Sequence, residues 1–161
     1  MHKKSMTEEF QFSLFSTQFA FNIDLLNCKL SHLERLNSME KQQQFEYLTI
    51  FDSVVTQIRA MLLERGKKNY TFQNYFKEIG KPEIAERIDN LLDEPFDPQN
   101  SRSIRTALKF ISDKFICHLD EIDSLDLGHA NYIMSVLSNP HSSNSLNKIL
   151  KSLIDIINCN Q

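Results

Sequence analysis

The segment from Ser103 to Asp123 has the most regular hydrophobic pattern in the chain. Its apolar residues are spaced four, three, four and seven positions apart, at Ile104, Leu108, Ile111, Phe115 and Ile122. This spacing places all five on one face of a helix. His118 occupies the long gap in register, so the predicted stripe contains one titratable ring. Because the ordinary pKa of an imidazole lies near neutral pH, His118 is the first candidate for chemistry.

A second stripe predicts a long helix at the start of the chain. This helix begins at Thr7, an N-cap residue followed by two glutamates, and runs to about Leu36. Its stripe consists of Phe15, Phe19, Leu26, Leu30 and Leu33. The alternation of Phe10, Phe12 and Leu14 is also typical of a strand. The stripe continues past that alternation without a break, so we expect a helix.

A third stripe predicts another long helix between Ser38, which can cap it, and Gly66. The stripe consists of Leu48, Phe51, Val55, Ile58 and Leu62. Gly66 is flanked by basic residues, as is typical of a helix C-terminus.

Helix-capping residues, glycine and proline predict the short elements that follow. Thr71 caps a short helix that ends at Gly80, and Pro82 stands at the first position of the next helix. Two closely spaced prolines make residues 94–100 a loop.

Either Ser101 or Ser103 then caps the central helix, which we expect to end at about Leu125. Asp126-Leu127-Gly128 breaks the pattern there, and a short helix follows from Ala130 to Leu137. The stripe of the last helix consists of Leu146, Leu150, Leu153 and Ile157.

Composition agrees with a single helical domain. Only 3 glycines and 4 prolines occur in 161 residues, few for a β-rich fold. With 41% hydrophobic and 24% charged residues, the chain has enough apolar side chains for one core. We therefore predict an all-α, single-domain antiparallel helical bundle with a core from about residue 7 to 158.

Charge and cysteine content limit the function classes. A net charge of −3 creates no overall attraction to nucleic acid or to an anionic membrane, so such contacts would need a local patch. The 3 widely separated cysteines do not indicate a disulfide framework, and we expect a cytoplasmic protein. We find neither a signal peptide nor an uninterrupted apolar run of membrane-spanning length.

Charged residues surround His118 in the sequence. Lys114 lies one turn earlier, while Asp113 and Asp120 are close on either side. Such neighbours can orient an imidazole and tune its pKa for proton transfer. The alternative interpretation is that His118 packs in the core or in a dimer interface, because a hydrophobic stripe on a helix usually indicates packing.

Four other basic residues, Arg59, Arg105, Lys67 and Lys68, are candidates for contacts with RNA or a nucleotide. Arg59 lies at the edge of the stripe of the second long helix, where its guanidinium could contact a phosphate. Pairing with a carboxylate is the favoured alternative, with Asp52, Asp113, Asp120 and Glu121 as the candidates. Lys67 and Lys68 are close in sequence to aromatic residues, so they could touch RNA, or they could form a solvated helix end.

Cys28 and His32 are four positions apart, a spacing that can hold two metal ligands. A structural zinc site needs four ligands, and the sequence has no second closely spaced pair. We expect neither a metal nor a cofactor.

The phrase ISDKFICHLD, residues 111–120, resembles the signature helix of HEPN (higher eukaryotes and prokaryotes nucleotide-binding) domains, especially the branch linked to bacterial abortive infection. Asp113, Lys114, His118, Leu119 and Asp120 match that signature. The segment IFDSVVTQIRAMLL and the aromatic segment YTFQNYF also resemble the family, so the resemblance spans residues 50–123.

The resemblance implies an RNA- or nucleotide-binding protein, of the kind found in defence or toxin-antitoxin systems. HEPN ribonucleases use a histidine and an arginine, paired across a dimer, to cleave RNA without a metal. This chain has Ser112 where the family has that arginine. Lys114, Arg105 or Arg59 could supply the charge in space, and otherwise cleavage is expected to be weak or absent.

Two hypotheses therefore stand. The first is a degenerate HEPN-like RNA-binding protein or ribonuclease with His118 at its centre. The second is a non-enzymatic interaction module that forms a homodimer through the central helix and the first helix.

Overall fold

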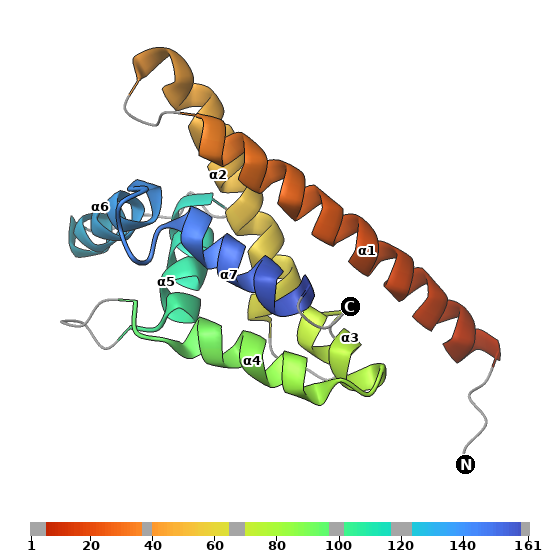
Figure 1. Cartoon of the computed structure of the whole chain (residues 1–161). Helices are drawn as coiled ribbons and strands as arrows, with labels where there is room; N and C mark the ends of the chain where they lie inside the picture. Colours follow the sequence, from red (N-terminus) through yellow and green to blue (C-terminus); the bar gives the residue numbers. More distant parts are fainter. Residues whose placement is uncertain (1–5, 37–39, 65–69, 97–101, 117–123, 159–161) are drawn as a thin grey trace.

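A computed structural model describes residues 6–36, 40–64, 70–96, 102–116 and 124–158 of the chain (Figure 1). Within these ranges the regular structure is helical, and no strand is present. The elements are α1 (Met6–Arg35), α2 (Lys41–Ile58), the π-helical turn η1 (Arg59–Leu63), α3 (Phe72–Glu78), α4 (Pro82–Asp93), α5 (Ile104–Ile111), the π-helical turn η2 (Ser112–Ile116), α6 (Ser124–Ser138) and α7 (Leu146–Asn158). The prediction of an all-α fold is confirmed.

Helix α1 lies along the outside of the molecule and packs against α2, α3 and α7 (Figure 1). The predicted stripe of α1 is buried, from Phe15 at one end to Leu33 at the other. Phe19 stacks on Tyr75 with ring centroids 4.0 Å apart, and its edge contacts Phe72 and Phe76 of α3. The helical interpretation of the alternating segment is confirmed, because α1 is helical from Met6 to Arg35.

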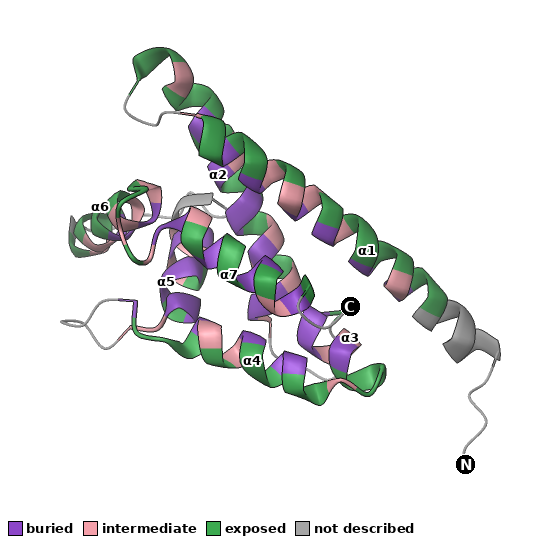
Figure 2. Ribbon diagram, viewed as in Figure 1, coloured by how far each residue is buried: buried purple, intermediate pink, exposed green. Residues whose placement is uncertain are grey.

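Helix α2 crosses the centre of the fold, and most of its predicted stripe is buried, as Figure 2 shows. The prediction for Leu48 is wrong, because its side chain is 38% exposed while Tyr47 is 4% exposed. The end of α6 explains the difference, since the Tyr47 hydroxyl donates to the Ser138 carbonyl oxygen. The N-cap of α2 is Glu40, whereas Ser38 and Gly66 lie outside the described residues.

The predicted boundaries of α3 and the predicted start of α4 are confirmed. The Thr71 side chain accepts a hydrogen bond from the backbone N–H of Asn74 and so caps α3. Gly80 has a φ of 78°, a conformation that glycine adopts at little cost. Pro82 is the first residue of α4, where the absence of its N–H does no harm.

Ser103 caps α5, because its side chain accepts from the backbone N–H of Thr106. Ser101 lies outside the described residues. Ile104, Leu108 and Ile111 are buried in the core of the chain itself, so a dimer through the central helix cannot use these three residues. The α-helix then widens into η2, a change that the hydrophobic period did not predict.

The predicted break at Gly128 is wrong. Helix α6 begins at Ser124 and runs through Gly128 to Ser138. A glycine inside a helix costs about 1 kcal/mol relative to alanine. Burial of Ala130, Ile133 and Leu137 on the same helix outweighs that cost.

One continuous hydrophobic core contains residues from all seven α-helices of the described chain. The predicted stripe of α7 is part of it, from Leu146 to Ile157. This helix lies between α1 and α4 and packs against both (Figure 1). Within the described residues, no helix combines the length and apolar character needed to cross a membrane.

Candidate functional site

The two π-helical turns lie in the part of the fold where the sequence places the site. Turn η1 extends α2, and turn η2 extends α5. Each turn packs against the helix that leads into the other one. Because π-helical turns are rare and occur frequently at functional sites, this pair marks a candidate site.

The Arg59 guanidinium joins the two turns. Its Nη1 forms an ion pair with Asp113 and donates to the Ser112 hydroxyl at 3.3 Å, while its Nε lies 3.6 Å from Glu64. Asp113 is one of the carboxylates considered as a partner of Arg59, so the predicted pairing is confirmed. The guanidinium therefore lies next to Ser112.

The Arg59 side chain is 24% exposed and that of Asp113 is 33% exposed, so a ligand in solvent can reach the pair. Ser112 itself is fully buried. Its hydroxyl can hold Arg59 in place, but it cannot contact a ligand directly.

A second ion pair ties η2 to α6. The Lys114 ammonium lies 3.3 Å from the Asp126 carboxylate, and both side chains are partly exposed. Exposed pairs of this kind contribute about 0.2–1 kcal/mol, so the contact orients Lys114 more than it stabilises the fold.

Four of the predicted site residues have no described position. His118 and Asp120 belong to residues 117–123, and Lys67 and Lys68 belong to residues 65–69, outside the described ranges. Their roles remain predictions from the sequence.

Arg105 is paired with carboxylates within the fold. Its side chain is 10% exposed and forms ion pairs with Asp89 at 2.6 Å and Asp93 at 2.8 Å. It also donates to the Leu62 carbonyl oxygen at 3.2 Å, which lies within η1. These partners occupy the guanidinium, so Arg105 holds α4, α5 and η1 together instead of facing a ligand.

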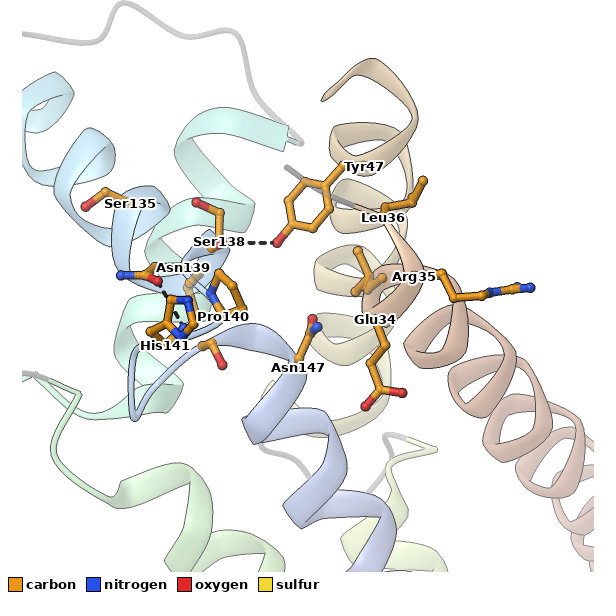
Figure 3. Close-up of a pocket in the computed structure, with 13 residues that line it drawn as sticks. Glu34, Arg35, Leu36, Tyr47, Ser135, Ser138, Asn139, Pro140, His141 and Asn147 are labelled. Atoms are coloured by element: carbon orange, nitrogen blue, oxygen red, sulfur yellow. Dashed lines mark hydrogen bonds between the residues drawn. The ribbon is translucent and has the colours of Figure 1, made fainter. Parts of the chain in front are cut away.

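A cavity of about 720 Å³ lies elsewhere in the fold (Figure 3). It is lined by the ends of α1 and α6, the start of α7, and Tyr47 of α2. The lining residues are Leu33, Glu34, Arg35, Leu36, Tyr47, Ser135, Leu137, Ser138, Asn139, Pro140, His141, Ser145 and Asn147. Sequence reasoning missed this cavity, because its walls come from segments about a hundred residues apart that share no motif.

Two polar groups of the cavity have unusual environments. Burial raises the pKa of the Tyr47 hydroxyl to about 12, and this hydroxyl donates to the Ser138 carbonyl oxygen over a long 3.4 Å. The side-chain oxygen of Asn147 is buried and accepts no hydrogen bond within the described structure.

Among the described side chains, no group of three or more His, Cys, Asp or Glu residues is placed to hold a metal ion. Cys28 is a free, exposed cysteine on α1. Comparison of the chain with protein-family models, with curated proteins and with solved structures finds no match.

Proposed function

We propose that the protein is an HEPN-like domain that binds RNA or a nucleotide, and that Arg59 supplies the charge that Ser112 lacks. The hydrogen bond from Arg59 to the Ser112 hydroxyl carries this proposal. It brings a guanidinium from the neighbouring helix to the position where the resemblance expects an arginine. A planar guanidinium can brace a phosphate through two N–H groups, as the family arginine would.

The local charge among the described residues limits the affinity of this site for a phosphate. Arg59 and Lys114 face three carboxylates, those of Glu64, Asp113 and Asp126. A phosphate must compete with Asp113 for the guanidinium, which lowers its affinity for this site. The resemblance gives His118 the proton transfer at the 2′-hydroxyl, a step that needs no metal.

Single-stranded RNA binding at low salt, followed by fluorescence anisotropy, tests the proposal. Arg59→Gln is expected to weaken binding several-fold and to lower the slope of log affinity against log salt by about 0.7, the value for one lost phosphate contact. Asp113→Asn is expected to strengthen binding, because it removes the competing carboxylate. Arg87→Gln, at an exposed position on α4, is the matched control and should bind like the native protein.

Cleavage is tested with native protein, with Asp113→Asn, which removes the carboxylate paired with Arg59, and with Asp113→Asn combined with His118→Ala. Cleavage that appears in the second protein, persists with chelator and is lost in the third supports a decayed nuclease site. If Arg59→Gln and Asp113→Asn leave RNA binding unchanged in folded protein, the proposal is wrong.

The second hypothesis, a homodimeric interaction module, is favoured by a different observation. Leu14 and Phe21 are 52% and 65% exposed on α1, and they lie seven positions apart on one face. That face is separate from the buried stripe of α1, so a second copy of the chain could cover it.

A further inference from the structure

The cavity at the ends of α1 and α6 has the dimensions of a small-molecule site. Its volume of about 720 Å³ falls within the range of roughly 300–1,000 Å³ that such sites occupy. Leu33, Leu36, Tyr47, Leu137 and Pro140 provide apolar walls. A ligand that fills it should therefore have an apolar body.

Asn147 requires a hydrogen-bond donor from such a ligand. Its Oδ1 atom is buried and has no donor among the described residues, although most buried polar atoms in proteins are paired. Figure 3 shows the Asn147 side chain on the α7 wall of the cavity. A donor in the ligand would remove the cost of leaving this oxygen unpaired.

The charges around the cavity favour a positive donor. Glu34 lines the cavity and forms no ion pair with a described residue. Arg35, its neighbour, donates from Nε to the Ser31 carbonyl oxygen at 3.1 Å, and its guanidinium points away from the cavity in Figure 3. The carboxylate of Glu34 is therefore not neutralised by the adjacent arginine.

The helix dipoles also favour a positively charged group in the cavity. Helices α1 and α6 both end at the cavity, where their last carbonyl groups carry partial negative charge. The positive end of α7 also reaches the cavity, but the Ser145 side chain caps it by accepting from the backbone N–H of Lys148. The Lys148 ammonium is held by the carbonyl oxygens of His141 and Ser142, at 3.5 and 2.8 Å.

We infer that the cavity binds a small organic amine with an apolar body. The protonated nitrogen donates to Asn147 Oδ1 and pairs with the Glu34 carboxylate, while the body contacts the apolar walls. This site is separate from the π-helical turns, and the inference does not depend on the proposed RNA-directed function.

The test uses phenethylamine and 3-phenylpropionate as probes, because they have similar apolar bodies and opposite charges. Isothermal titration calorimetry and thermal unfolding are measured on the full chain at millimolar probe concentrations. Phenethylamine is expected to bind and raise the melting temperature, whereas 3-phenylpropionate is expected to do neither.

Variants locate the site. Asn147→Leu and Glu34→Gln should each weaken phenethylamine binding about tenfold, as for the loss of a hydrogen bond to a charged group. Asn147→Asp should tighten it, which keeps the test decisive if Asn147→Leu does not fold. Asn90→Leu and Glu86→Gln, both exposed on α4, are matched controls that should bind like the native protein.

Three outcomes overturn the inference. The first is equal binding of the two probes, and the second is no detectable binding of phenethylamine. The third is amine binding that neither Glu34→Gln nor the Asn147 variants change.

Discussion

At the scale of single residues, Arg105 connects three elements of the fold through polar contacts. Its guanidinium contacts carboxylates of Asp89 and Asp93 on α4 and the Leu62 carbonyl oxygen in η1. Gln73 of α3 donates to the same carbonyl oxygen at 3.0 Å. Arg105 therefore helps satisfy a backbone group near the end of a π-helical turn, where the regular hydrogen-bond ladder stops.

We expect Arg105→Met to lower the free energy of unfolding by about 2 kcal/mol, because it leaves two carboxylates and one carbonyl oxygen without this donor. The carboxylates are partly exposed and can regain water, which keeps the loss below that of a fully buried pair. Urea unfolding followed by circular dichroism measures the change. Arg87→Met, an exposed position on the same α4, is the control, and an equal effect of the two substitutions would contradict this role for Arg105.

The two arginines show how far single residues can be interpreted from sequence. Arg59 lies at the edge of a hydrophobic stripe, and this position alone predicts that its guanidinium pairs with a carboxylate, as it does with Asp113. Arg105 was instead expected to face RNA. Its partners lie on α4, and only the packing of α4 against α5 brings them together.

At the scale of elements, Gly80 and Gly128 were both expected to end a helix, but they have different roles in the structure. Gly80 has a φ of 78°, so a side chain there would be strained. Gly128 lies inside α6, and a Cβ added there would meet no atom within 4 Å. Its only disadvantage in the helix is the conformational freedom that glycine loses on folding.

Replacing each glycine by alanine should therefore change stability in opposite directions. We expect Gly128→Ala to raise the free energy of unfolding by about 0.5–1 kcal/mol, and Gly80→Ala to lower it by about 1 kcal/mol. Thermal and urea unfolding of the two variants beside the native protein measure both changes. A destabilising Gly128→Ala would mean that this position needs the absence of a side chain for another reason.

The elements were predictable where a local signal decides the structure. Thr71, Ser103 and Pro82 each act through their own backbone surroundings, and all three mark helix starts as expected. The π-helical turns were not predictable in this way. In η1 the Leu62 carbonyl oxygen accepts hydrogen bonds from Gln73 of α3 and Arg105 of α5, which come from distant parts of the chain.

At the scale of the whole molecule, the apolar faces of the helices meet in one core, and this arrangement follows from the periods of the stripes. The candidate site was partly predictable, because the position of Arg59 at the edge of its stripe predicts its pairing with Asp113 at the junction of η1 and η2. The cavity was not predictable, since no short segment contains more than a part of its wall.

The two functional hypotheses predict the same oligomeric state, a homodimer. A composite HEPN-like site and an interaction module both need a second copy of the chain. The described part of the central stripe is already buried within one chain. The outer face of α1, with Leu14, Phe21 and Cys28 at intervals of seven, is an exposed surface with the spacing of a symmetric helix pair.

We therefore expect the native protein to form a dimer that Phe21→Glu weakens about tenfold or more, because two carboxylates would be buried in an apolar interface. Phe21 is 65% exposed in the single chain, so the substitution should leave the fold intact.

Phe45→Glu is the matched control, since Phe45 is 82% exposed but lies on α2. Sedimentation velocity over a range of concentrations measures the association. A native protein that stays monomeric at high micromolar concentration would contradict the dimer itself. Dissociation by Phe45→Glu instead of Phe21→Glu would move the interface from α1 to the start of α2.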